Sequence, residues 1–369
     1  MPRPYMTARR ALPPVLALVL AMGGGCGAPY LLHLAQGQAN ILLTSKPIEE
    51  VIADPGAGPD IKAKLELVRT VKRYGEDVVG LKADGSFTTF TPVEGPAALY
   101  VVTAAPKLKL EPHTWTFPLV GTFPYKGFFD KSMAEAEEAR LARAGFDTYL
   151  RPAAAYSTLG WFTDPVLEPL LASGEVSIAN VILHEKTHST IFVPNHVAFD
   201  EGLATFVGRQ GAIDFFAATD GPGSPHHVEA IKRMEDELRF GRFLQVVIAE
   251  LEGLYGSDIP SSEKLERRER IFEKSRLKML KERDGYNYPT LAEFYTETPL
   301  NNAFLVTLKL YTVDVETYVM VYERHGRDLA KTVEFFKGVE RLGDDPAAYV
   351  RRWLDTGGAR AAAAAGPTL

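Results

Sequence analysis

Two histidines and a glutamate lie inside the apolar run VILHEKTHSTIF, residues 181–192. His184, Glu185 and His188 form the pattern H-E-x-x-H. On a helix, residues i and i+4 share one face with Cβ atoms about 5–6 Å apart, so both imidazoles can bind one metal ion. Glu185 occupies the position of the glutamate that holds a water molecule in zinc peptidases with this motif. The spacing therefore predicts a zinc site with Glu185 as the base.

The segment around the motif is predicted to be a buried helix. GEVSIANVILHEKTHSTIF has no internal glycine or proline, is apolar on most faces and ends before Pro194. A buried imidazole or carboxylate without a partner destabilises the fold, so the three polar groups require one. A metal ion is a partner for all three.

A third ligand is required because catalytic zinc keeps three protein ligands and one open position. The metzincin pattern is excluded, since Ile191 and Pro194 stand where its glycine and histidine would be. NHVAFDEGLATFVGRQG predicts a second helix that supplies Glu201, and helix, loop, helix with a glutamate ligand is the gluzincin arrangement. Gly202 and Gly208 are expected to weaken this helix by up to about 1 kcal/mol each and to make the third ligand less rigid.

Peptide hydrolysis also requires a donor to the oxyanion, and two tyrosines are candidates. Tyr311 lies in NNAFLVTLKLY and Tyr156 in AYSTLGWF, although either could instead be a core residue with a bonded hydroxyl. AYSTLGWFTDPVL is typical of an edge strand that pairs with a peptide backbone, and a plain connecting loop is the alternative. The candidate substrate-binding residues are Ser157, Thr158, Leu159 and Gly160.

The mode of cleavage depends on a group that binds the free α-amine of a peptide. An exopeptidase generally uses an acid, and Asp200, Asp164 and Glu111 are all candidates. An endopeptidase would share the metal site and differ only in the cleft. The sequence leaves both open.

Around these residues the chain predicts an α+β fold. Residues 29–80 have helical periodicity, and SFTTFTPV, AALYVVTAA, TWTFPLVGTF and FDTYLRP predict a small, mostly antiparallel sheet interrupted by a helix over 131–145. After the two motif helices the chain is again helical. We therefore predict a zincin-like lobe over residues 26–215, a helical lobe over 216–355 and a disordered tail over 356–369.

Residues 1–25 are predicted to be a signal peptide. Three arginines precede a short apolar run and a stretch of small residues that ends at Cys26, the only cysteine of the chain. This order is typical of a bacterial lipoprotein with a lipidated cysteine, and an ordinary cleaved signal or an uncleaved anchor is the alternative. We expect an exported protein attached to a membrane of the cell envelope through this lipid, on the periplasmic face of the outer membrane.

Composition restricts the class of protein and of partner. Hydrophobic residues make up 46% and charged residues 24%, which is typical of a folded globular chain. The net charge of -6 argues against nucleic acid as a partner, because nucleic-acid-binding proteins normally carry a basic excess. Peptides and a membrane are the partners that the sequence indicates.

Several segments together resemble the putative aminopeptidase family of bacterial lipoproteins: ILHEKTHSTIFV, AFDEGLATFVGRQG, AAPKLKLEPHTWTFPLVGTFPYKGFFD, AYSTLGWFTDPVL and NNAFLVTLKLY. The resemblance covers most of residues 26–335. It implies a zincin-type metallopeptidase with His184, His188 and Glu201 as ligands of one zinc ion and Glu185 as general base. The sequence departs from the family pattern at Lys186, which lies about 200° around the helix from His184 and is expected to point away from the metal.

A second class of function has the same motif. In a non-catalytic envelope protein that binds or assembles partners, the zinc site would be structural or degenerate. Structural zinc sites are usually closed by four protein ligands. Three ligands and a retained Glu185 favour the enzyme.

Overall fold

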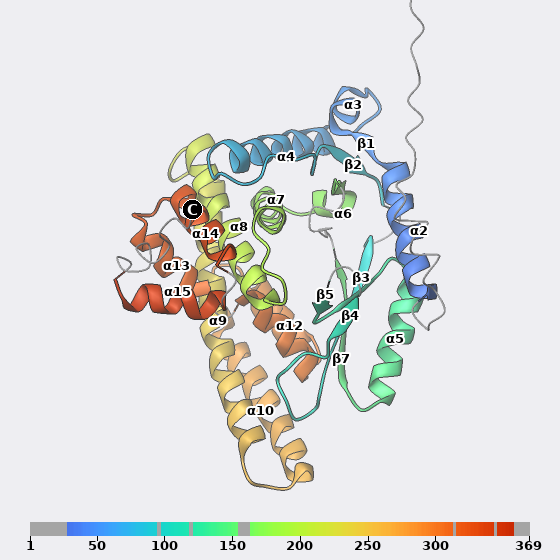
Figure 1. The fold of residues 1–369 in the computed structure, drawn as a ribbon, viewed down its shortest axis with the longest axis vertical. Helices are drawn as coiled ribbons and strands as arrows, with labels where there is room; N and C mark the ends of the chain where they lie inside the picture. Colours follow the sequence, from blue (N-terminus) through green and yellow to red (C-terminus); the bar gives the residue numbers. More distant parts are fainter. Residues whose placement is uncertain are drawn as a thin grey trace, which may run out of the picture.

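The computed structural model describes residues 28–93, 97–117, 121–153, 163–312, 315–342 and 345–357, and Figure 1 shows their arrangement. Helices predominate, and small sheets lie in one half of the molecule (Figure 1). The predicted α+β class is confirmed. Within the described ranges, no helix is long and apolar enough to cross a membrane. The predicted signal peptide and Cys26 lie outside these ranges.

The strands form small, mostly antiparallel sheets, as predicted. The main sheet has the order β6-β3-β7, with strands Lys126–Phe128, Leu99–Ala105 and Asp147–Ala153. A second, two-stranded sheet pairs β4 (Trp115–Phe117) with β5 (Gly121–Phe123) in antiparallel orientation. The third sheet contains β1 (Lys46–Pro47), β2 (Thr89–Thr91) and β8 (Val166–Leu167), and its β2–β8 pair is parallel. Each of the predicted β-rich runs contains at least one of these strands.

Alternation along the strands gives the main sheet two different faces, because successive side chains point to opposite sides. Val102 and Ala104 of β3 pack in one cluster with α5 (Lys131–Arg143) and with Tyr30 of α2 (Ala28–Thr44). Ala105 of β3 instead packs in the cluster that contains α12 (Asn302–Thr312). The face toward α12 is called the inner face below.

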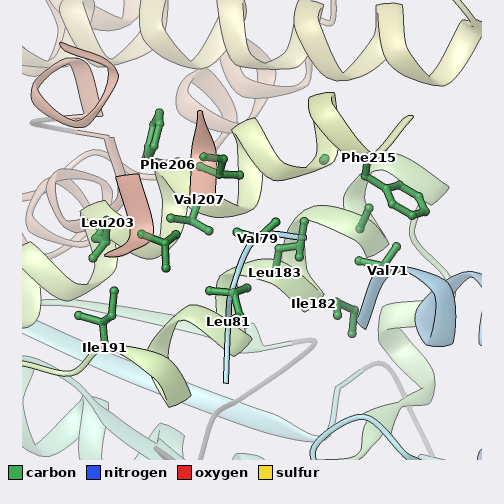
Figure 2. Packing of buried hydrophobic residues seen from close by; sticks show 14 of the residues in the cluster. Val71, Val79, Leu81, Ile182, Leu183, Ile191, Leu203, Phe206, Val207 and Phe215 are labelled. Carbon is green, nitrogen blue, oxygen red and sulfur yellow. The ribbon is translucent and has the colours of Figure 1, made fainter. Parts of the chain in front are cut away.

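Two helices at the centre of the molecule carry the metal-site motif (Figure 1). They are α7 (Glu175–Thr190) and α8 (Val197–Thr219), and both confirm the predicted helices. Leu183 of α7 and Val207 of α8 are fully buried in a core that also contains Val71 of α4 (Pro59–Asp77), as Figure 2 shows. A fully buried aliphatic side chain contributes about 1.5–3 kcal/mol. The apolar core therefore holds the two motif helices against each other and against α4.

The remaining helices surround this centre. The long pair α9 (Pro225–Gly256) and α10 (Ser261–Glu282) extends toward the bottom of Figure 1. The other helices are α3 (Ile48–Ala53), α6 (Glu168–Leu171), η1 (Arg283–Gly285), α11 (Thr290–Glu297), α13 (Val315–Arg324), α14 (Leu329–Glu340) and α15 (Pro346–Asp355).

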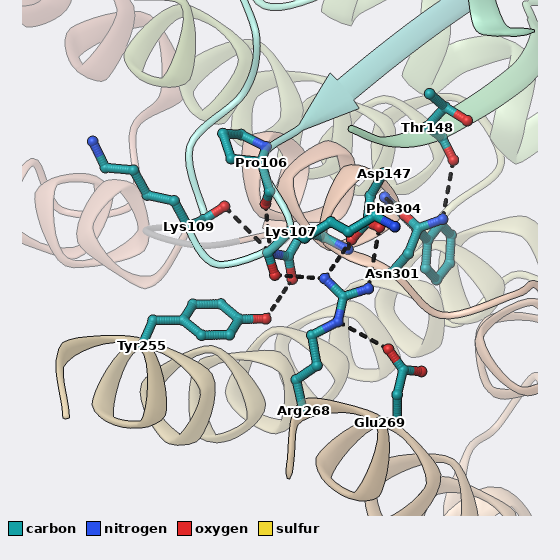
Figure 3. Close-up of polar contacts among 11 residues, drawn as sticks. Pro106, Lys107, Lys109, Asp147, Thr148, Tyr255, Arg268, Glu269, Asn301 and Phe304 are labelled. Atoms are coloured by element: carbon teal, nitrogen blue, oxygen red, sulfur yellow. Dashed lines mark hydrogen bonds and ion pairs between the residues drawn. The ribbon is translucent and has the colours of Figure 1, made fainter. Parts of the chain in front are cut away.

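A buried polar cluster fixes the start of α12 against the main sheet (Figure 3). Arg268 of α10 donates two hydrogen bonds to Asp147, the first residue of β7, at 2.8 and 3.1 Å. The backbone N–H of Asn302 donates to the same carboxylate at 3.0 Å, and the side chain of Asn301 donates to the Thr148 carbonyl at 3.0 Å. These bonds set the position of α12 relative to β7.

Lys186 lies within the H-E-x-x-H motif, but on the side of α7 that faces α4. Its side chain is fully buried, and Nζ donates to Glu76 of α4 at 2.8 Å and to Asp84 at 3.1 Å. Burial acts to raise the pKa of both carboxyl groups, but hydrogen bonds and nearby charge outweigh it and lower both pKa values. Lys186 acts on both groups, together with Lys72 at Glu76 and the Ser86 N–H at Asp84. The ammonium group therefore points away from the metal-site face, as predicted, and anchors α7 to its neighbours.

We expect Lys186→Met to lower the free energy of unfolding by about 3 kcal/mol, because it leaves the largely buried Asp84 carboxylate without its cation and leaves Glu76 with Lys72 alone. Urea unfolding followed by circular dichroism measures this loss. The double variant Lys186→Met/Asp84→Asn should recover part of it. Lys274→Met on α10, where the lysine is exposed, should change the free energy by less than about 0.5 kcal/mol. A loss below about 1 kcal/mol for Lys186→Met would refute the anchoring role.

Candidate active site

The three predicted metal ligands converge on one point between α7 and α8. His184 Nε2 lies 3.1 Å from His188 Nε2, and Glu201 Oε2 lies 3.4 Å from the first nitrogen and 3.5 Å from the second. His188 and Glu201 are buried, and His184 is half-buried. In the described part of the chain, this is the one group of histidine and acidic side chains found that could hold a metal ion.

The distances within this group fit a tetrahedral zinc site. Zinc binds imidazole nitrogen and carboxylate oxygen at about 2.0–2.2 Å, so two ligand atoms at the tetrahedral angle lie about 3.3–3.6 Å apart. The three observed separations fall in or close to that range. Two imidazoles and one carboxylate are also a donor set typical of catalytic zinc.

The electrostatic environment of the group favours a positive charge. Burial acts to lower the pKa of His188, but the charges of Glu201, Glu185 and Asp200 outweigh it and raise that pKa to about 9. Burial acts to raise the pKa of Glu201, and the two histidines more than reverse this and lower it. The surrounding acids therefore attract a cation to the point where the three ligand atoms meet.

Glycine residues on α8 allow the two ligand helices to approach closely. A Cβ atom at Gly208 would lie 2.7 Å from the Asn180 carbonyl oxygen and 3.2 Å from the His184 Cβ. A Cβ atom at Gly202 would lie 2.9 Å from the Tyr318 ring. We expected these glycines to make the third ligand less rigid, but that expectation considered helix propensity alone. In the structure they are sites of close packing, and Gly208 packs directly against His184, the first candidate ligand.

Glu185 directly follows His184 on α7 and is half-buried. Its charge contributes to the raised pKa values of His188, Tyr125 and Tyr311. These effects place its carboxylate within electrostatic reach of the ligand group and of both tyrosines. This position suits the general base that the sequence predicts.

Tyrosine side chains form the next layer of the site. The Tyr311 ring, on α12, lies 6.4 Å from the His184 ring between centroids. Tyr125, which the sequence analysis did not select, also lies here, and its hydroxyl donates to Glu201 Oε1 at 3.5 Å. Burial raises the pKa of both tyrosines, so each hydroxyl stays protonated and can donate. Tyr125 lies within TFPYKGFFD, a segment that resembles the family. This resemblance was the only signal in the sequence for Tyr125.

The three acids predicted as candidates for binding a peptide amine differ in their burial and in their partners. Asp200 is buried and accepts a hydrogen bond from the Val193 N–H at 3.0 Å, which holds the loop between α7 and α8. Glu111 is exposed and pairs with Lys109 at 2.6 Å. Asp164 is buried at 4% exposure. The amine-binding role stays unassigned among these three.

Several predicted site residues lie outside the described ranges. They are Tyr156, Ser157, Thr158, Leu159 and Gly160. This segment directly follows β7. The oxyanion and substrate-binding roles of these residues stay predictions.

Comparison with known proteins gives one family. The sequence profile of the family described as "Putative aminopeptidase" matches residues 29–354. No curated protein and no solved structure matches the chain. The matched range contains the three ligands, Glu185 and both tyrosines of the site, and it covers well over half of the sequence. The chain therefore belongs to the "Putative aminopeptidase" family.

Proposed function

We propose that this protein is a zinc-dependent metallopeptidase of the gluzincin type. The observation that carries the proposal is the convergence of two imidazoles from α7 and one carboxylate from α8 on a single point. Glu185 lies between the two histidines in the sequence of α7. Membership of the aminopeptidase family supports peptide-bond hydrolysis. His184, His188 and Glu201 would hold one zinc ion.

The chain's own residues account for the proton transfers of hydrolysis. A bound zinc ion would lower the pKa of a coordinated water and polarise a peptide carbonyl. Glu185 takes a proton from the attacking water as its oxygen bonds to the carbonyl carbon, and later gives that proton to the amine as the C–N bond breaks. Tyr311 donates its hydroxyl proton in a hydrogen bond to the carbonyl oxygen as that oxygen becomes negative.

The ligand count favours catalysis over a structural role. A structural zinc site is usually closed by four protein ligands, whereas this group offers three within the described residues. A purely structural site also has no use for Glu185. Aminopeptidase action follows the family description, and an endopeptidase with the same site is the alternative.

Attachment to the cell envelope is a further part of the proposal. Cys26 would carry the lipid, and α2 begins two residues later, at Ala28. The protein would then act on peptides at the periplasmic face of the outer membrane.

Metabolic labelling with palmitate should mark the full chain in an exporting bacterial host and should fail for Cys26→Ser. Equal labelling of both proteins would exclude the anchor.

We expect Glu185→Gln to lower kcat by about 100- to 10,000-fold, because the amide cannot accept the proton from water. Mass spectrometry of a mixed peptide library, incubated with the zinc-loaded full chain in detergent, measures cleavage. Shortening from free N-termini would identify an aminopeptidase, and internal cuts an endopeptidase. Glu175→Gln, at the start of the same helix, is the matched control and should retain activity. If the zinc-loaded native chain cuts no peptide, a non-catalytic binding protein becomes the better interpretation.

We expect Tyr125→Phe to weaken zinc binding by about 10-fold, because hydrogen bonds that orient a ligand typically change metal affinity by 10–100-fold. Competition with a chromophoric chelator measures the affinity. Tyr295→Phe is the control, since Tyr295 is also buried and its hydroxyl is hydrogen-bonded to Ser275 in the cluster that contains α10 and α11. Equal zinc affinities for Tyr125→Phe and the native chain would show that this hydrogen bond does not support the ligand.

A further inference from the structure

The inner face of the main sheet brings an arginine to the candidate active site. Tyr149 and Arg151 are two residues apart on β7, so their side chains lie on the same face of the sheet. Phe304 and Tyr311 are two turns apart on α12 and also share one face. The centroids of the Tyr149 and Phe304 rings lie 5.1 Å apart. Arg151 makes a hydrogen bond to the hydroxyl of Tyr311. Because β7 and α12 run side by side, a sequence separation of 160 residues becomes a direct contact.

The chemistry of the two groups determines which of them donates this hydrogen bond. Arg151 Nη2 lies 3.3 Å from the Tyr311 hydroxyl oxygen. A guanidinium group has only donors, so in this bond the hydroxyl oxygen must be the acceptor. The single hydroxyl proton of Tyr311 is then free for a different acceptor. A hydroxyl held in this way is prepared to donate.

The charge of Arg151 also acts on Tyr311. Burial raises the pKa of the Tyr311 hydroxyl, and Glu201 and Glu185 add to this, whereas Arg151 acts to lower it. The guanidinium carbon lies 5.9 Å from the centre of the ring. A phenol beside a cation is a stronger hydrogen-bond donor to an oxygen that becomes negative. Arg151 therefore offsets part of the effect of the two glutamates.

We propose that Arg151 is a positioning residue for the hydrolysis, which holds the Tyr311 hydroxyl so that its proton points at the oxygen of the carbonyl under attack. The inference rests on the proposed function and adds a residue to it. Arg151 acts through Tyr311, and Tyr311 makes the contact with the reacting group. Neither residue is one of the three candidate zinc ligands, and neither is the proposed general base.

A double-mutant cycle on the zinc-loaded full chain tests the inference. We expect Tyr311→Phe to lower kcat by about 100-fold, as loss of one oxyanion donor does, with KM changed little. Arg151→Met should lower kcat by about 10- to 100-fold, because misplacement of a catalytic group costs up to that factor. The double variant should be no slower than Tyr311→Phe alone. Arg151→Lys, which keeps a charged donor, should recover part of the loss.

Readouts other than turnover separate this role from a structural one. A phosphinic peptide, which resembles the tetrahedral intermediate, should bind Arg151→Met more weakly in calorimetry by a factor close to the loss in kcat. Zinc affinity and melting temperature should stay near the native values. Arg276→Met on α10 is the matched control, since in the ranges that the structure describes Arg276 pairs only with Glu273 one turn earlier on the same helix, and it should behave as the native chain.

Three results would overturn the inference. Multiplicative losses in the double variant would show that Arg151 acts without Tyr311. A raised KM at unchanged kcat would show that Arg151 binds substrate. Native kcat in Arg151→Met, in a chain whose activity still depends on Glu185, would refute the positioning role and leave the proposed function intact. Full activity of Glu185→Gln would instead refute the proposed function itself.

Discussion

Close packing between α7 and α8 brings the ligands of the site together. Gly208 lies against the Asn180 carbonyl and the His184 Cβ, and a side chain there would force the helices apart. Glu201 lies seven residues earlier, two turns along the same face of α8, so the same approach carries its carboxylate to the histidines. The apolar core around Leu183 and Val207 maintains this contact (Figure 2). The convergence of the three candidate metal ligands is therefore a consequence of helix packing.

Groups of opposite charge lie on two sides of the motif helix α7. On one side, buried Lys186 neutralises Glu76 and Asp84, and this ties α7 to α4 and to the chain that follows it. On the other side, Glu201, Glu185 and Asp200 surround the two histidines with negative charge, which attracts a cation. The main sheet and α12 complete the site from a third direction, because the polar cluster at Asp147 aligns β7 with α12 (Figure 3).

Local spacing was enough to predict the centre of the site. The four-residue spacing of His184 and His188 determines a shared helix face, and a second helix after a short loop can place Glu201 in only a few ways. Arg151 and Tyr125 could not be predicted in this way, because their positions depend on strand register and on contacts across long stretches of chain. The packing role of Gly208 was also hidden, since helix propensity describes a helix in isolation. Family resemblance pointed to the segment around Tyr125 but not to the residue's partner.

X-ray absorption spectroscopy at the zinc edge, on the full chain loaded with one equivalent of zinc, is the decisive measurement. We expect two imidazole nitrogens and a carboxylate oxygen at about 2.0–2.2 Å, with at least one further oxygen from solvent. His188→Ala and Glu201→Gln should each remove one protein ligand from this shell. A shell closed by four protein ligands, or a spectrum unchanged by both substitutions, would show that zinc binds elsewhere or only as a structural ion.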